Sequence, residues 1–253
     1  MKVKIHNSTY IFLLLSFLSG YFEYIFLFLI TIAIHELGHA IFASIINFKY
    51  SNIIIYPFGG ITIYDEDLNT KTNIELFVLI GGIIFQLLFF ILIYFLFNNG
   101  LITEHVYLII KKINYLLISF NFMPIIPLDG GKLLNIILDK VFNYRLSSII
   151  SIIISIFSIL FFIIYKRTYF SILLTIFLIK CIYIEIINLK YRFNRFILER
   201  YINNYSFKKI KIINNINKLK RDYYHIINNE FERSFINRLF NKWSILFIFD
   251  RCA

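Results

Sequence analysis

The chain has 253 residues, of which 59% are hydrophobic and only 16% are charged, and its formal net charge is +11. This balance argues against an ordinary soluble domain, in which charged residues make up about a quarter of the chain, and it is typical of a membrane protein. The aromatic residues belong to a general excess of Ile, Phe, Tyr, Asn and Lys, so we expect no nucleic-acid partner.

Six apolar runs cover most of residues 10–187, and each is a candidate membrane-spanning helix. Crossing the hydrocarbon core of a bilayer takes about 20 apolar residues. Four of the runs approach that length, whereas the first and the fourth are short. We therefore expect an all-α polytopic membrane protein with about six transmembrane helices. In chain order the runs are Tyr10–Phe22, Tyr24–Ile46, Ile74–Phe97, Ile113–Leu128, Leu146–Tyr165 and Tyr169–Ile187.

The second run carries three ionisable side chains, His35, Glu36 and His39, at a depth where a charged side chain costs roughly 2.5–3.5 kcal/mol. Residues four apart lie on one face of a helix, so both imidazoles can bind one metal ion with Glu36 beside them. This H-E-x-x-H spacing is typical of zinc peptidases, in which the glutamate is the general base. Polar packing between helices is the less favoured alternative.

Residues 52–65 contain β-branched and aromatic residues around Pro57 and two glycines. This pattern predicts a hairpin or a short re-entrant loop just inside the membrane boundary. Such a loop could offer a strand edge to an extended substrate, or it could fill space beside the metal, and both interpretations stay open. Phe58, Gly59 and Gly60 are therefore candidate support residues of the site.

Isolated polar residues lie at or within the other apolar runs. For each of them an interfacial position or a hydrogen bond between helices is favoured over a catalytic role. They are Glu23, Glu75, Gln86, Lys180 and Glu185.

A third metal ligand must come from another part of the chain, because catalytic zinc usually keeps three protein ligands and one open position. Asp129 follows Pro124 and Pro127, which interrupt the helix, and it precedes Gly130. Broken backbone at membrane depth is tolerated where it lines a wet cavity. The fourth run places Asp129 near its cytoplasmic end, as the second run places His39, so the two side chains should lie at similar depth. A helix-capping carboxylate is the alternative.

The distribution of Lys and Arg predicts that both termini are cytoplasmic. The segment after the sixth run, residues 188–253, has 14 Lys and Arg against 5 Asp and Glu. We expect a membrane-embedded metalloprotease core at 1–189 and a basic cytoplasmic tail at 190–253, which could be a truncated or degenerate regulatory module. The tail could be a solvated helix or an amphipathic surface that lies on anionic lipid.

Two motifs together, "HELGHA" (35–40) and "NFMPIIPLDGG" (121–131), resemble those of the site-2 proteases, which are intramembrane zinc metalloproteases. Three further stretches, "YPFGGI" (56–61), "PLDGGKLL" (127–134) and "RFILERY" (195–201), are similar to the sporulation branch of that family. The resemblance implies one Zn²⁺ per chain and assigns residues to the site. The implied zinc ligands are His35, His39 and Asp129, the implied catalytic base is Glu36, and Asn121, Pro124, Pro127 and Gly130 are implied to support the site.

The resemblance also implies hydrolysis of a peptide bond near the cytoplasmic face of the membrane. In the sporulation branch the substrate is the membrane-associated precursor of sigma-K, and inhibitory sporulation membrane proteins are the partners. The implied location is the cell membrane, or a membrane around the forespore, of a spore-forming bacterium, with the chain as a multi-pass protein of the lipid bilayer. The alternatives are another site-2-type protease with a different membrane substrate and a catalytically inactive scaffold. A metal transporter is disfavoured because no second H-x-x-x-H half is present.

Overall fold

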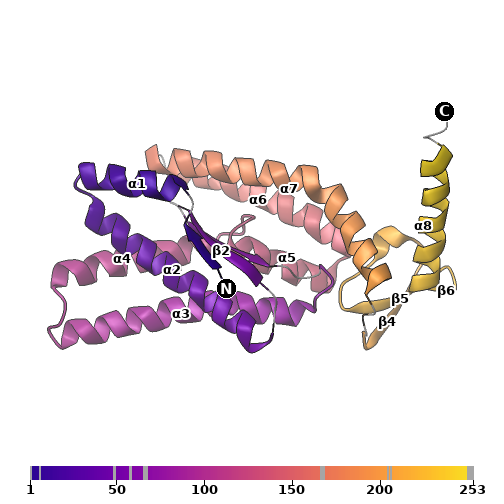
Figure 1. The fold of residues 1–253 in the computed structure, drawn as a ribbon, viewed down its shortest axis with the longest axis horizontal. Helices are drawn as coiled ribbons and strands as arrows, with labels where there is room; N and C mark the ends of the chain where they lie inside the picture. Colours follow the sequence, from indigo (N-terminus) through magenta and orange to yellow (C-terminus); the bar gives the residue numbers. More distant parts are fainter. Residues whose placement is uncertain are drawn as a thin grey trace. The chain divides into compact units, whose positions relative to one another are not determined.

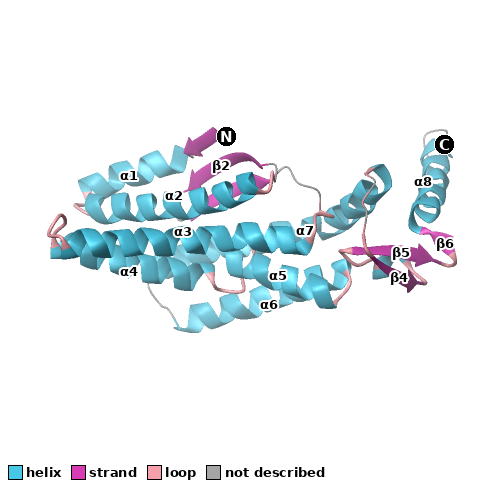
Figure 2. Ribbon diagram, turned by 90° about the horizontal axis from the view of Figure 1, so that it is seen from below, coloured by secondary structure: helices cyan, strands magenta, loops and turns pink. Residues whose placement is uncertain are grey.

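The computed structural model describes residues 2–5, 7–47, 50–56, 59–64, 68–165, 169–203, 205 and 207–249. These residues form a mostly helical chain that divides into two compact units. Unit 1 comprises Met1–Glu66, Asn73–Pro124 and Leu128–Leu133, and unit 2 comprises Asp67–Thr72, Ile125–Pro127 and Leu134–Ala253. Each unit has its own sheet and its own helices (Figures 1 and 2).

Unit 1 is built around helices α1 (Asn7–Leu18), α2 (Phe22–Ile45), α3 (Thr72–Asn98) and α4 (Glu104–Asn121). Helix α2 packs on α1 and on α4. The contact with α4 buries a cluster of Ile32, Ile109, Ile113 and Leu117. Helix α4 returns along α3, where Tyr107 stacks on Phe97 with ring centroids 4.5 Å apart. The long apolar helix α2 is thus held on several sides, which fixes the direction of its polar face.

A three-stranded sheet of unit 1 contains β1 (Lys2–Ile5), β2 (Tyr50–Tyr56) and β3 (Gly59–Tyr64). Strand β1 runs parallel to β2, and β2 pairs with β3 in antiparallel register from Tyr50 opposite Tyr64 to Tyr56 opposite Gly59. The antiparallel pairing of β2 with β3 is that of a hairpin, one of the two forms that the sequence predicts, and the residues between the two strands lie outside the described ranges. The sheet contacts α2 through β2 and β3.

Unit 2 contains most of α5 (Asp129–Val141), α6 (Tyr144–Tyr165), α7 (Tyr169–Ile202) and α8 (Glu232–Phe249). Helices α6 and α7 lie side by side (Figure 1). A second sheet follows α7, with β4 parallel to β5 and β5 antiparallel to β6. Its strands are β4 (Lys209–Ile213), β5 (Tyr223–Ile227) and β6 (Glu230–Phe231), and the 3₁₀ helix η1 (Ile216–Lys218) lies between β4 and β5. The buried core of this unit is Tyr144, Phe193, Phe196, Ile213, Leu219 and Ile227.

Three of the described helices are long and apolar enough to cross a membrane, namely Phe22–Ile45, Thr72–Asn98 and Tyr144–Ile164. They match the second, third and fifth predicted runs. The predicted bounds of the fourth run are wrong, because α4 ends at Asn121 and residues 122–128 are not helical. Two prolines in that segment explain the break, since proline disfavours helical backbone at the residue before it.

The prediction of an all-α chain is incomplete, because the described residues include two small sheets. The second sheet lies in the segment predicted as a solvated or amphipathic tail. Its strand β4, "KIKII", begins with the strict Lys–Ile alternation that is typical of a strand, and β5 is rich in the aromatic and β-branched residues that favour strands.

Arg200, close to the end of α7, is the centre of a buried polar network in unit 2. Its side chain is 2% exposed, and its guanidinium pairs with the Glu232 carboxylate at 2.8 Å. It also donates a hydrogen bond of 2.6 Å to the side-chain oxygen of Asn69. The Nδ1 atom of His225 lies 3.0 Å from the same Glu232 carboxylate. Removing one partner of such a buried pair typically costs about 3–5 kcal/mol, because it leaves the other charge buried without compensation.

Acid should destabilise unit 2 through this network. Burial lowers the pKa of His225 from its usual 6.5. Burial alone would raise the pKa of Glu232, but the hydrogen bond from His225 and the charge of Arg200 hold it below its usual value. Both groups bind fewer protons in the folded state than in the unfolded state, so stability rises with pH. The contribution of His225 is complete above its usual pKa and is lost as pH falls below that value.

We therefore expect a lower melting temperature for unit 2 at about pH 5 than at about pH 7. The single tryptophan, Trp243, lies in α8, and its fluorescence during heating in detergent gives the measurement. A melting temperature that does not change over this range would contradict a lowered pKa of His225 in the folded state.

Candidate metal centre

Helix α2 places His35 and His39 on one face, one turn apart, with Glu36 next to them. All three side chains are buried. The two Nε2 atoms lie 3.1 Å from each other. The Oδ2 atom of Asp129 lies 2.9 Å from the Nε2 of His35 and 3.1 Å from the Nε2 of His39. The structure thus brings together the three side chains that the sequence predicts as metal ligands, and they converge on one point within unit 1.

Asp129 reaches this point because it is the first residue of α5 and follows the break after α4. The break folds closely over the start of α5. A Cβ atom at Gly130 would lie 2.4 Å from the carbonyl oxygens of Phe122 and Met123, which is closer than any side chain allows. The glycine after Asp129 is therefore required by the path of the preceding loop, and Pro124 and Pro127 lie in that loop.

The two imidazoles are oriented by partners on α3. The Nδ1 of His35 lies 2.9 Å from the side-chain oxygen of Gln86, and the Nδ1 of His39 lies 3.0 Å from the carbonyl oxygen of Val78. Both partners are acceptors, so they suit the tautomer that carries its proton on Nδ1 and leaves the Nε2 lone pair for a metal at the shared point. Hydrogen-bond partners at the ring nitrogen that does not bind the metal fix the tautomer and the ring orientation of metal-binding histidines.

Glycines let α3 approach the histidine face of α2. A Cβ atom at Gly38 would lie 2.5 Å from the carbonyl oxygen of Gly81. A Cβ atom at Gly82 would lie 2.4 Å from the Nε2 of His39 and 2.9 Å from the Cε1 of His35. Small residues allow this close backbone approach between apolar helices. At Gly82 any side chain would occupy the space into which the ligand atoms point.

Two further polar groups contact the cluster. The Nδ2 of Asn121, the last residue of α4, lies 3.3 Å from the Nε2 of His35. The ammonium group of Lys132 lies 3.3 Å from Oδ1 of Asp129, the carboxylate oxygen that does not face the histidines. Lys132 was not predicted as a site residue, although its position three residues after Asp129 on a helix is the signal that could have found it.

The remaining residues that the sequence predicts as support for the site belong to the loop around Pro57. Gly59 and Gly60 begin strand β3 and pair with Tyr56 and Ile55 of β2. Phe58 lies outside the described residues. Of the two positions that the sequence favours for Gln86, the structure shows the hydrogen bond between helices, but the sequence does not predict that its partner is a histidine of the cluster. The only sequence feature that points to this contact is an isolated amide in a long apolar helix.

The donor set fits zinc. Two neutral imidazole nitrogens and one carboxylate oxygen are ligands that catalytic zinc sites use, with an open fourth position. Ligand atoms about 2.0–2.1 Å from a tetrahedral zinc lie roughly 3.3 Å apart. The three atoms here are 2.9–3.1 Å apart, so a shift of a few tenths of an ångström would seat the ion.

We expect Gln86→Leu to weaken zinc binding by about 10- to 100-fold, which is the usual cost of losing a hydrogen bond that orients a metal ligand. Leucine removes the acceptor that holds the His35 tautomer while it keeps a side chain of similar bulk. Zinc affinity, measured by competition with a chromogenic chelator, tests this expectation. Thr31→Val, which alters a hydrogen bond within α2, is the matched control. An unchanged affinity in Gln86→Leu would contradict the orienting role.

Two histidines from one helical turn, a carboxylate from another helix and a buried glutamate beside them define a zinc-hydrolase type of site. Residues 23–103 match peptidase family M50, and this stretch includes the H-E-x-x-H motif but ends before Asp129. The chain is 29% identical to stage IV sporulation protein FB of Bacillus subtilis over 140 residues, which are 55% of this chain and 49% of that protein. It is 28% identical to a zinc metalloprotease of Methanocaldococcus jannaschii over 123 residues, which are 47% of this chain and 35% of that protein.

Among solved structures, the fold is similar to a site-2 protease from Methanocaldococcus jannaschii. The TM-score is 0.57 at 25% sequence identity, and the match covers 72% of this chain and 89% of that chain. The chain spans about half the length of the Bacillus relative and about a third of the archaeal metalloprotease. Together these matches show that residues 23–103 are similar to peptidase family M50 and that the fold is similar to that of a site-2 protease.

Proposed function

We propose that the chain is an intramembrane zinc endopeptidase that cleaves a membrane-associated precursor protein near the cytoplasmic face. The observation that carries this proposal is a buried cluster of His35, His39 and Asp129 beside Glu36. Both histidines and Glu36 lie on α2, a helix apolar enough to cross a membrane, and Asp129 joins them from α5. An ionisable cluster at that depth costs free energy, and ionisable residues within membrane-spanning segments typically mark functional sites.

Each residue has a separate role in this proposal. His35, His39 and Asp129 would hold one zinc ion, which when bound would supply a water of lowered pKa and Lewis-acid polarisation of the scissile carbonyl. Glu36 accepts the proton of the attacking water and returns it to the leaving amine as the peptide bond breaks. Gln86 and the carbonyl of Val78 orient the two imidazole rings, and Lys132 holds the outer oxygen of Asp129.

We infer six membrane crossings with both termini in the cytoplasm. Three helices have the length and hydropathy of a span, and the remaining crossings are assigned to the apolar parts of α1, α4 and α7. The excess of Lys and Arg in the last third of the chain supports this orientation. This orientation places the start of α5, and with it the cluster of His35, His39 and Asp129, toward the cytoplasmic side.

Thiol labelling tests this orientation. Once Cys181 and Cys252 have been replaced by serine, we expect Lys140→Cys to react with a membrane-impermeant thiol reagent only from the cytoplasmic side. Asn99→Cys, in the exposed loop between α3 and α4, should react only from outside. The reverse pattern would place the cluster away from a cytoplasmic substrate and would overturn the inferred orientation.

The likeness to a stage IV sporulation protein supports a finer proposal for the substrate. We propose that the precursor is pro-sigma-K, that inhibitory sporulation membrane proteins regulate the cleavage, and that the enzyme resides in the cell membrane or in a membrane around the forespore. The basic segment at 190–253 is proposed as the cytoplasmic part that the precursor approaches.

Reconstitution tests the proposal. The purified chain and pro-sigma-K should be placed in the same vesicles, and the products should be identified by mass spectrometry. We expect one cut that removes the pro-sequence, and a much slower cut of the same precursor when its membrane-associating segment is deleted. Absence of cleavage of pro-sigma-K together with cleavage of other tethered peptides would exclude this substrate and leave the peptidase assignment intact. Absence of any cleavage by zinc-loaded protein would exclude the peptidase assignment.

A further inference from the structure

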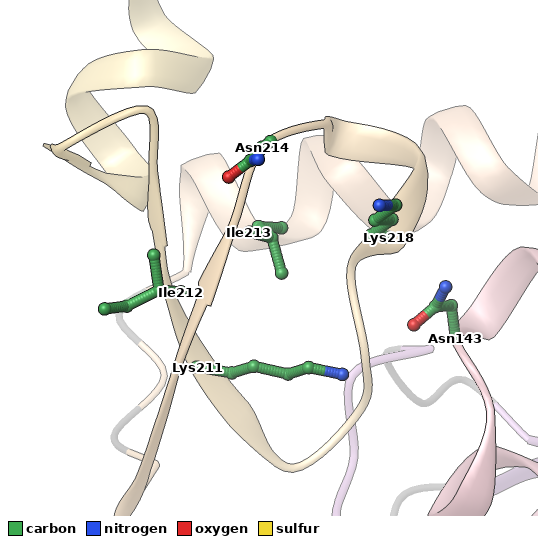
Figure 3. A pocket seen from close by; sticks show the side chains of 6 residues that line it. All are labelled: Asn143, Lys211, Ile212, Ile213, Asn214 and Lys218. Atoms are coloured by element: carbon green, nitrogen blue, oxygen red, sulfur yellow. The ribbon is translucent and has the colours of Figure 1, made fainter.

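A pocket of about 360 Å³ opens between the second sheet and the start of α6, entirely within unit 2. Figure 3 shows the Lys211 side chain extending across this pocket toward the side where Asn143 lies, with Lys218 at the same end. Ile213 points inward from β4. The lining residues are Asn143, Lys211, Ile212, Ile213, Asn214 and Lys218.

The pocket carries positive charge without a balancing carboxylate. Its polar lining consists of two lysines and two asparagines. Among the described residues, no carboxylate forms an ion pair with Lys211 or Lys218. A third cation, Arg145, is close by, since it donates a 3.1 Å hydrogen bond to Asn217, the neighbour of Lys218. Two lysines and two asparagines that line one pocket suit an anion with several acceptor oxygens, such as a phosphate.

The pocket also lies at one end of an apolar helix. Asn143 directly precedes α6, of which Tyr144–Ile164 is long and apolar enough to cross a membrane. Beyond the pocket, α6 continues with exposed apolar side chains such as Leu146 and Ile153. If α6 crosses the bilayer as proposed, the lysines lie at the depth of the lipid head groups and the apolar side chains lie at the depth of the acyl chains.

We propose that this pocket binds the phosphate group of an anionic phospholipid whose acyl chains lie along α6. Basic pockets beside membrane-spanning helices on the cytoplasmic side recognise anionic head groups in this way. The isoleucines of the wall and the apolar helix favour a lipid over a soluble phosphate, which would gain nothing from either. The proposal rests on the membrane crossing of α6 and is independent of the peptidase activity.

Native mass spectrometry of the full-length protein in detergent tests this site. Delipidated protein is titrated with palmitoyl-oleoyl phosphatidylglycerol or with palmitoyl-oleoyl phosphatidylcholine, and the bound lipid is counted. The pocket variant is Lys211→Ala with Lys218→Ala. The matched control is Lys190→Ala with Lys208→Ala, which removes the same charge from two exposed positions. Circular dichroism verifies that both variants are folded.

We expect one tightly bound phosphatidylglycerol, with affinity about 30-fold lower in the pocket variant, because a lysine near an anionic surface contributes about 1 kcal/mol. The control variant should bind like the unmodified protein, and phosphatidylcholine should bind weakly to all three. An equal loss of phosphatidylglycerol affinity in both variants would show that only the net charge of the protein matters, and it would overturn the proposed site. Displacement of the lipid by inorganic phosphate or ATP at comparable concentration would overturn the lipid as the ligand.

Discussion

The Glu36→Gln variant should bind zinc like the unmodified protein and cleave its substrate at least about 100-fold more slowly. General acid–base catalysis by one side chain contributes roughly 10²- to 10⁴-fold, and glutamine can neither accept nor return the proton. Glutamine has the same length as glutamate, and the predicted ligands His35, His39 and Asp129 are untouched, so the metal cluster should remain intact.

Single-turnover cleavage and zinc content should be measured on the same preparation of this variant. Glu23→Gln is the matched control, because it makes the same substitution in the first turn of the same helix, where the carboxylate is about half exposed. The control should retain full activity and zinc. Cleavage by Glu36→Gln at a rate close to that of the control would remove Glu36 as the base.

The Asp129→Asn variant should lose both zinc and cleavage. The carboxylate is the only predicted ligand that carries a charge, and its Oδ2 lies within 3.1 Å of both imidazoles. An amide oxygen is a weaker ligand for zinc, and it leaves Lys132 without its charged partner. Losing a hydrogen bond that orients a metal ligand lowers the metal affinity by about 10- to 100-fold, so loss of the ligand itself should lower it by at least about 100-fold.

Zinc content after dialysis against buffered free zinc gives the measurement for Asp129→Asn. Glu104→Gln, at the exposed first turn of α4, is the control for loss of one negative charge. Full zinc occupancy in Asp129→Asn at zinc concentrations that load the control would show that the third ligand is another group.

The sequence predicts the centre of the site because its main signal is local. His35 and His39 are four residues apart in a run that must be helical in a membrane, so their common face follows from helix geometry alone. Asp129 could be added because prolines and glycines mark a break in an apolar segment. That its carboxylate meets the two imidazoles depends on tertiary packing, and only the structure gives the distances.

The groups that orient the ligands could not be predicted in the same way. The carbonyl of Val78 has no side-chain signal at all, because any residue at that position offers the same oxygen. Gln86 was visible as an isolated amide, but which side chain it contacts depends on how α3 lies against α2. That contact depends in turn on Gly38, Gly81 and Gly82, whose missing side chains bring the two helices together.

The second unit shows a different limit of sequence reasoning. Segment 195–201 belongs to the basic tail, which the sequence predicts as a solvated helix or an amphipathic surface, yet Phe196 is fully buried and Arg200 nearly so. Arg200 can be buried because Glu232 and Asn69, far apart in the sequence, both meet its guanidinium. Charge counts along the chain do not reveal such pairing, since a buried ion pair and two exposed charges have the same composition.

Zinc removal and return in the unmodified protein tests the central claim most directly. Protein stripped with a chelator and reconstituted in vesicles with a membrane-tethered precursor should not cleave it. Activity should return in proportion to added zinc and reach its maximum at one bound zinc per chain. Cleavage that persists in the zinc-free protein would contradict a metal centre formed by His35, His39 and Asp129.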